Sequence, residues 1–136
     1  MFPSETKILI VDDQKVIRTL VRKHLGDLGF TNIVEADDGA TAWPLYIEAL
    51  AERKPFNLVI SDMNMPLMDG ISFLIKVRSY HASKDTPFIL LTAENDKDTV
   101  VKAMQWKVSA FIVKPFTREL LVTKMTQVHE GKRAAA

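Results

Sequence analysis

Cysteine is absent from the 136-residue chain, which excludes disulfide bonds and thiolate metal sites. The chain also lacks an excess of charge of one sign, because its formal net charge is only +1. It therefore has no broad electrostatic footprint for nucleic acid. The segment Met1–Lys7 lacks the apolar core of a signal peptide, and no apolar run approaches the length that spans a membrane. These absences predict a cytoplasmic protein without membrane insertion.

What is present fits a single globular domain. The length is ordinary for one domain, and the hydrophobic content of 47% is enough for a real core. We find no internal repeat, low-complexity tract or linker. We therefore expect a lead-in over residues 1–6, one domain over 7–130 and a tail over 131–136. Within the tail, Ala134–Ala136 has the composition of a cloning scar and is given no role.

Five short apolar runs alternate with stretches of helical spacing. Four runs are continuous rather than alternating, as in parallel strands that are covered on both faces. The second run is more polar and is predicted to lie at an edge of the sheet. Alternating strands and helices favour an α/β fold built from right-handed βαβ units. The expected strands are Lys7–Val11, Asn32–Ala36, Leu58–Ser61, Phe88–Leu91 and Ala110–Val113.

The helical stretches carry start and stop signals. Gly29 is expected to end the first helix, and Thr117 is expected to cap the fifth. Pro44 would cost about 3 kcal/mol inside a helix. We therefore start the second helix late, with Thr41 as its N-cap and Pro44 in its first turn, and end it near Arg53.

Reactive side chains occur where these strands end. Asp12 and Asp13 follow the first strand, Asp62 closes the third, and Thr92 and Lys114 end the fourth and fifth. Ligands of open α/β sheets bind at the carboxyl ends of the strands. Three acids, a hydroxyl and an ammonium brought together there predict a phosphoryl-transfer site. Each position alone is weak evidence, and their coincidence is strong.

Converging carboxylates need a cation. Two of them about 4 Å apart repel by roughly 4 kcal/mol at an effective dielectric of about 20. An all-oxygen site favours Mg²⁺, and the carbonyl of Asn64 could add a ligand. We expect Asp62 to be the nucleophile that becomes an aspartyl phosphate. Lys114, the Thr92 hydroxyl and the Ala93 N–H would then balance the charge on its phosphoryl oxygens.

Structural roles are the alternative for each residue taken singly. Asp13, Asp62 or Thr92 could simply cap a helix or turn, and Lys114 could be a solvated turn residue. Met63, Met65 and Met68 are interpreted as loop packing, and His24, His81 and His129 as structural histidines. Arg18, Arg22 and Lys23 are interpreted as a solvated face of the first helix.

Four motifs resemble those of response regulator receiver domains of two-component systems, and specifically the single-domain chemotaxis regulators (CheY-like). The resemblance spans about Lys7 to His129. The motifs are Val-Asp-Asp at 11–13, Ser-Asp-Met-Asn-Met-Pro-Leu-Met-Asp-Gly at 61–70, Leu-Thr-Ala-Glu at 91–94 and Val-Lys-Pro-Phe at 113–116. The resemblance implies a flavodoxin-like doubly wound (βα)5 sandwich, whose five-stranded parallel sheet has the order 2-1-3-4-5 known for that family.

The resemblance also implies roles for individual residues. Asp62 would receive a phosphoryl group from a histidine kinase, with Mg²⁺ bound by Asp13, Asp62 and the Asn64 carbonyl and, through water, by Asp12. Thr92 and Lys114 would hold the phosphoryl oxygens. The remaining implied roles are a switch aromatic at Phe111, an output face that includes Trp106 and Lys124, and tuning of dephosphorylation by Asn64 and Glu94.

The implied partners are a histidine kinase, a flagellar switch protein and a phosphatase, and the protein would be a monomer or weak dimer. Two departures from the family pattern bear on partners. Phe111 replaces the usual Tyr, and Trp106-Lys107 replaces a small-residue stretch after the fourth helix. Lys107 is expected to change that helix end. Trp106 is either an interface anchor or a ring packed on its own domain.

Three rival functions remain open at this point. A haloacid-dehalogenase-type phosphatase or ATPase would also use an aspartyl phosphate, but it usually has a second acid where Asn64 stands. A flavodoxin-like cofactor binder would need a phosphate-binding first loop, and the loop at Asp12-Asp13 is acidic. A phosphorelay intermediate, or a receiver excised from a larger regulator, would share all the motifs.

Overall fold

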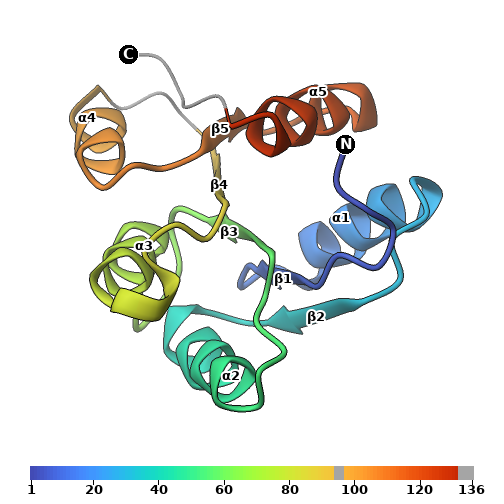
Figure 1. The fold of residues 1–136 in the computed structure, drawn as a ribbon. Coiled ribbons are helices and arrows are strands. Elements are labelled where there is room, and N and C mark those ends of the chain that lie inside the picture. The colour runs from blue at the N-terminus through green and yellow to red at the C-terminus, as the bar shows by residue number, and fades with distance from the viewer. Residues whose placement is uncertain (94–96, 132–136) are drawn as a thin grey trace.

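The computed structural model describes residues 1–93 and 97–131. Its centre is a five-stranded parallel sheet in the order β2-β1-β3-β4-β5 (Figure 1), which confirms the predicted fold class. The strand positions agree with the expected runs to within a residue at each end. The strands are β1 (Ile8–Val11), β2 (Ile33–Ala36), β3 (Leu58–Asp62), β4 (Phe88–Thr92) and β5 (Ala110–Val113).

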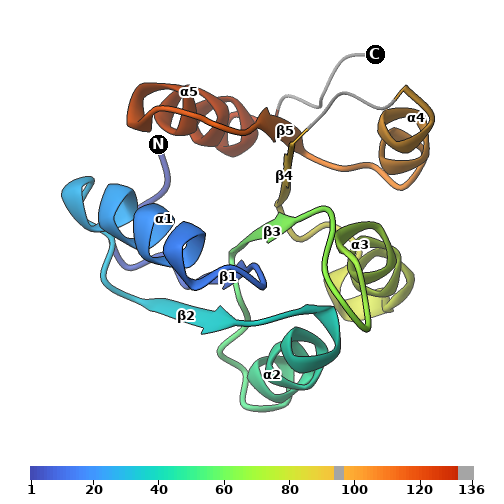
Figure 2. The ribbon, with the colours of Figure 1, turned by 180° about the vertical axis from the view of Figure 1, so that it is seen from behind.

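Within the described residues, four α-helices connect successive strands and a fifth follows the last strand, and together they cover both faces of the sheet (Figures 1 and 2). The predicted cap of the fifth is confirmed, because the Thr117 side chain accepts from the Leu120 N–H. Gly29, with φ of 96°, follows the first as predicted. The helices are α1 (Lys15–Asp27), α2 (Gly39–Ala51), α3 (Gly70–Ser79), α4 (Lys97–Gln105) and α5 (Arg118–His129), with a 3-10 turn, η1, at His81–Ser83.

The sheet separates two hydrophobic cores. Alternate residues of each strand face α1 and α5 on one side, where Ile10 and Ile60 meet Leu25 and Met125. The opposite residues face α2, α3 and α4, where Tyr46, Phe73 and Phe88 form an aromatic cluster. Burial on both faces explains why four of the strands read as continuous apolar runs. β2 lies at an edge, as predicted, and Ile33, Val34 and Glu35 are only partly buried.

The prediction for the start of the second helix is wrong. α2 begins at Gly39, and its N-cap is Asp38, whose side chain accepts from the Thr41 N–H at 2.8 Å. Pro44 therefore lies in the helix interior, where it removes one backbone hydrogen bond. The helix ends at Ala51, two residues earlier than expected, and Arg53 has a left-handed φ of 60°. The Asp38 cap, a local signal, thus sets the early start, and the Gly39 N–H of the first turn is satisfied by the Met68 carbonyl.

Lys107 shapes the end of α4, as the sequence led us to expect. Its φ of 58° is left-handed, and its N–H donates to the Met104 carbonyl while that of Val108 reaches Ala103. This is a Schellman end, in which glycine usually occupies the left-handed position. The Lys107 carbonyl accepts two bonds from the buried guanidinium of Arg78, which ties the end of α4 to α3.

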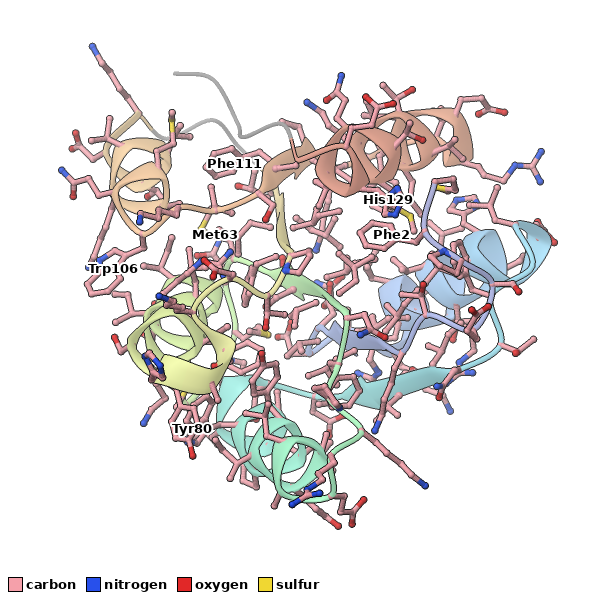
Figure 3. All side chains as sticks on the ribbon, in the orientation of Figure 1. Phe2, Met63, Tyr80, Trp106, Phe111 and His129 are labelled. Carbon is pink, nitrogen blue, oxygen red and sulfur yellow. The ribbon has the colours of Figure 1, made fainter. Side chains whose placement is uncertain are left out.

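Two further features complete the fold. The lead-in is packed against α5, because the rings of Phe2 and His129 lie 4.9 Å apart (Figure 3). Over the described ranges 1–93 and 97–131, none of the helices combines the length and the apolar composition needed to cross a bilayer.

We predict that Lys107→Gly stabilises the protein, because glycine adopts a left-handed φ without the roughly 1 kcal/mol cost that a side chain incurs. The expected gain in the free energy of unfolding, measured by urea denaturation, is about 0.5–1 kcal/mol. Lys107→Ala is the matched control, since it removes the same side chain but retains a Cβ. An equal gain in both variants would show that the Lys side chain, and not the backbone, carries the cost.

Candidate functional site

Three carboxylates converge at the carboxyl end of the sheet. Ligand oxygens of Asp12, Asp13 and Asp62 all lie within 4.8 Å of one another. The register explains the meeting, because β1 and β3 are neighbours and Val11 pairs with Ser61, which places the next residues of both strands side by side. Asp12 and Asp62 are buried and Asp13 is exposed. The sequence predicted this cluster.

Lys114 reaches the same point from β5. Its Nζ lies 2.9 Å from Asp62 Oδ1 and 3.1 Å from Asp12 Oδ2. β4 stands between β3 and β5, so the long side chain has to cross the end of β4, and the Lys114 N–H anchors it there on the Thr92 carbonyl. The side chain is only 17% exposed. The alternative of a solvated turn residue is therefore wrong for Lys114.

The ionisation of the cluster follows from burial and from these pairs. Burial raises the pKa of Asp12 above its ordinary value, and the nearby charge of Asp62 adds to the rise, although the Gln14 N–H and Lys114 oppose it. Burial alone would lower the pKa of Lys114, but its bonds to Asp62 and Asp12 hold it above its ordinary value. Lys114 is thus a permanent cation, and Asp12 is a carboxylate whose charged form is disfavoured.

The capping alternatives fare differently. Gln14 is the N-cap residue of α1 but makes no side-chain capping bond. Asp12 contacts this helix start instead, since its Oδ1 accepts from the Gln14 N–H at 2.9 Å, and its other oxygen is left for Lys114. The side chain of Asp62 is engaged with Lys114 and not with the turn that follows it. A different acid, Asp69, caps α3 by accepting from the Ser72 N–H.

The loop between β3 and α3 is held close to Asp62. The Gly70 N–H donates to the Met63 carbonyl, and a Cβ on Gly70 would lie 2.2 Å from the Asp62 carbonyl oxygen. Met63 is buried in the core, which agrees with its interpretation as packing. Asn64 follows as an exposed residue. A hollow of about 270 Å³ opens beside it, between the starts of α3 and α4.

The other predicted residues lie around this point. Thr92 is buried at the end of β4, and Ala93 follows it as an exposed residue. Glu94 falls outside the described residues. Phe111 is partly buried in β5 beside Leu90.

Two predicted output residues lie on the neighbouring helices. Trp106, just after α4, is also partly buried and packs against the core (Figure 3). Lys124 is a partly exposed residue of α5.

The interpretation of Arg18 as solvated is wrong, and its contact with the site was not predicted from the sequence. Arg18 Nη1 donates to the carbonyl oxygen of Asp12 at 2.6 Å, and its side chain is only 13% exposed. Glu35 on β2 forms ion pairs with both Arg18 and Arg22. The only signal in the sequence was Glu35, a charged residue in the otherwise apolar strand β2. Its presence does not reveal which cation it binds.

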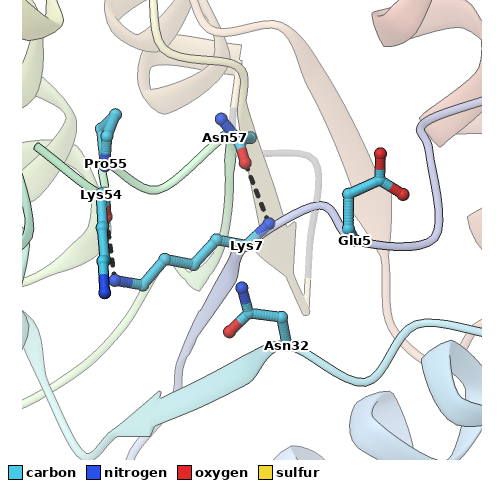
Figure 4. A pocket seen from close by; sticks show the side chains of 6 residues that line it. All are labelled: Glu5, Lys7, Asn32, Lys54, Pro55 and Asn57. Carbon is cyan, nitrogen blue, oxygen red and sulfur yellow. Dashed lines mark hydrogen bonds between the residues drawn. The ribbon is translucent and has the colours of Figure 1, made fainter.

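A second hollow, of about 470 Å³, lies at the opposite, amino ends of the strands (Figure 4). Lys7 crosses it and donates to the Lys54 carbonyl, while its backbone N–H donates to the Asn57 side chain (Figure 4). These bonds are internal to the protein, and no group of the carboxylate cluster lines this hollow.

The donors of the cluster fit Mg²⁺. The converging groups are all carboxylate oxygens, which are hard ligands, and there are too few of them to complete a coordination shell without water. They carry more negative charge than Lys114 alone balances. A divalent cation is therefore the natural complement of this site.

Comparison with known proteins gives a consistent result. The family model "Response regulator receiver domain" matches residues 8–126. The chain is 41% identical over 124 residues to the chemotaxis protein CheY of Pseudomonas aeruginosa, covering 91% of this chain and 96% of that one. It is 38% identical over 122 residues to the chemotaxis protein CheY1 of Helicobacter pylori, covering 90% and 95%. The solved structure of the chemotaxis response regulator CheY4 of Vibrio cholerae has a TM-score of 0.78 and 34% identity, covering 91% and 98%.

We predict that Asp12→Asn raises the stability of the metal-free protein at pH 7 by roughly 1 kcal/mol, a usual size for one buried substitution. The folded-state pKa of Asp12 is raised, so its charged form destabilises the fold above that pKa. This loss of folding stability disappears as the pH falls from the raised pKa of Asp12 toward 3.8, the ordinary pKa of the side chain. The gap between the variant and the wild type should therefore narrow on acidification.

The measurement is urea denaturation in chelator at several pH values. Asp85→Asn, which changes an exposed acid in the same way, is the control and should alter nothing. A loss of stability in Asp12→Asn at pH 7 would mean that the ion pair with Lys114 outweighs the cost of burial.

Proposed function

The chain belongs to the response regulator receiver domain family, and from that membership we propose that Asp62 accepts a phosphoryl group from a histidine kinase. The observation that carries the proposal is the convergence of Asp12, Asp13 and Asp62 within 4.8 Å, with Lys114 bonded to two of them. Such an arrangement gives an acceptor carboxylate beside a cation site and a fixed ammonium.

In the proposed reaction a carboxylate oxygen of Asp62 attacks the phosphorus of a phosphohistidine. The new O–P bond forms as the P–N bond breaks, and the imidazole leaves with the electron pair. Mg²⁺, held by Asp13 and Asp62 with the Asn64 carbonyl and by Asp12 through water, would offset the charge of the carboxylates and of the phosphoryl oxygens. Lys114, the Thr92 hydroxyl and the Ala93 N–H would contact those oxygens.

Phosphorylation would act as a switch and not as a step of turnover on an external substrate. Thr92 would move toward the phosphoryl group and Phe111 would turn inward, which would change binding at the face made by α4, β5 and α5, including Trp106 and Lys124. Asn64 and Glu94 would tune the rate of dephosphorylation. The protein would work in the cytoplasm as a monomer or weak dimer, without nucleic acid, and a phosphatase would act on its phosphorylated form.

The main rival is an aspartyl-phosphate phosphatase or ATPase of haloacid-dehalogenase type. It is not favoured, because the residue two positions after Asp62 is Asn64, and an amide cannot serve as the general acid of that mechanism. A phosphorelay intermediate would use the same acceptor and differs only in what receives the phosphoryl group.

We predict that acetyl phosphate with Mg²⁺ adds one phosphoryl group to the protein, detected by intact mass. The adduct should be lost with a chelator and in Asp62→Asn, which should stay folded because it removes one like charge from the acidic cluster. An adduct that persists in Asp62→Asn would place the acceptor elsewhere. If no adduct forms, beryllofluoride distinguishes a short phosphate lifetime from an inactive receiver, because it mimics the acyl phosphate without hydrolysing.

The similarity to chemotaxis regulators supports a flagellar switch protein as the target. We predict that the beryllofluoride-activated protein binds a flagellar switch peptide about tenfold more tightly than the unmodified protein, a usual size for coupling between two sites. The measurement is fluorescence anisotropy of the labelled peptide, with Asp62→Asn as the control that should show no gain. Equal affinity of both forms would remove the flagellar role and leave the phosphoacceptor chemistry intact.

A further inference from the structure

Arg18 connects the edge of the sheet to the acidic site. It lies at the end of the first turn of α1, and its Nη1 donates to the Asp12 carbonyl at 2.6 Å. The same guanidinium contacts Glu35 at 3.1 Å and Asp37 at 3.4 Å, measured between nitrogen and carboxylate oxygen. With 13% of its side chain exposed, Arg18 is held in one arrangement between β2 and the loop after β1.

The carbonyl that Arg18 holds belongs to the peptide unit between Asp12 and Asp13. That unit is planar, so fixing its oxygen also fixes the direction in which the chain enters Asp13. The Asp12 side chain is held separately, by the Gln14 N–H and Lys114. Asp13 itself is exposed, so packing does little to place it. The position of its carboxylate relative to Asp62 therefore depends on the backbone that Arg18 holds.

Glu35 keeps Arg18 in place. It lies on β2 directly beside Ile10 of β1, and its two carboxylate oxygens receive Arg18 and Arg22 separately. Burial would raise the pKa of Glu35, but its bonds to Arg22 and Arg18 hold it below the ordinary value. It is therefore ionised at neutral pH. Arg22 also bonds to Glu35, but its Nη2 donates to the Ile33 carbonyl and not to the acidic loop.

We propose that Arg18 is a positioning residue for the Mg²⁺ site, which acts by fixing the Asp12–Asp13 peptide so that the Asp13 carboxylate faces Asp62. The proposal rests on the proposed function and deepens it, because it names what determines the affinity for the cation. Groups that orient metal ligands from outside the coordination shell typically change metal affinity by about 10- to 100-fold when they are removed.

The direction in which Mg²⁺ affinity changes when Arg18 is replaced distinguishes a positioning role from a purely electrostatic one. Arg18 is a cation close to a cation site, so if it acted only through its charge, its removal would strengthen Mg²⁺ binding. If it positions Asp13, its removal weakens Mg²⁺ binding. The two mechanisms thus predict opposite results for the same variant.

The test is a titration of the full chain with Mg²⁺ alone, followed by the amide NMR signals of Asp12, Asp13 and Asn64. Arg18→Met should bind Mg²⁺ about tenfold more weakly than the wild type. Arg18→Lys should bind with intermediate affinity, because one ammonium does not reproduce the planar fork. Arg22→Met, which loses the same anchor without touching the acidic loop, should stay within about twofold of the wild type.

The second measurement is the rate of labelling by acetyl phosphate. At saturating Mg²⁺ the rate for Arg18→Met should return to that of the wild type, because the residue affects cation binding and not the attack by Asp62. Thermal melts in chelator check that each variant is folded, and Arg18→Lys carries the test if Arg18→Met does not fold.

Three results would overturn the proposal while leaving the proposed function standing. The first is Mg²⁺ binding by Arg18→Met that is as tight as in the wild type or tighter. The second is an equal loss of Mg²⁺ affinity in Arg22→Met. The third is a labelling rate of Arg18→Met that stays low at saturating Mg²⁺. If the wild type itself does not bind Mg²⁺, the proposed function fails, and this inference fails with it.

Discussion

The structure depends on holding three carboxylates together where they repel one another. Asp12, Asp13 and Asp62 meet within 4.8 Å, and two of them are buried, so their repulsion is poorly screened by water. Lys114 offsets part of this charge by bonding to Asp12 and Asp62. The remaining negative charge favours a divalent cation, which would also offset the negative charge that a phosphoryl group brings.

The parallel sheet makes this concentration of charge feasible. All five strands run in the same direction, so their carboxyl ends lie together at one end of the sheet. Residues that are distant in sequence meet there, such as Asp12 and Lys114, which are 102 positions apart. The backbone around the site is tightly fitted. Gly70 allows the loop after β3 to approach Asp62, and the N–H of Gly39, the first residue of α2, bonds to Met68 in the same loop. Main-chain contacts thus hold the loop that follows Asp62.

Much of this arrangement could be predicted from the sequence, because it depends on local signals. Apolar runs of strand length and helical periodicity located the five strands and the five α-helices of the described residues, but not η1 or the ends of α2. The more polar run at 32–36 identified an edge strand. Reactive residues directly after strands predicted the acidic site, since in parallel sheets such positions share an edge. Thr117 was recognised as a cap for the same reason, because capping involves only neighbouring residues. The roles of Thr92, Phe111 and Trp106 remain proposals.

The sequence by itself therefore determined the order of elements, the strand ends and the identity of the acids. Only the tertiary structure decided three further features. α2 contains Pro44 in its interior, and the Gly39 N–H at its start bonds to the Met68 carbonyl of a distant loop. Lys107 takes a left-handed conformation, and its carbonyl accepts the Arg78 side chain from α3. The Arg18 side chain is largely buried because it donates hydrogen bonds to Glu35 and to the Asp12 carbonyl. The Gly39–Met68, Arg78–Lys107 and Arg18–Glu35 contacts join residues that are well separated in sequence, and helical and strand periodicity cannot identify such partners.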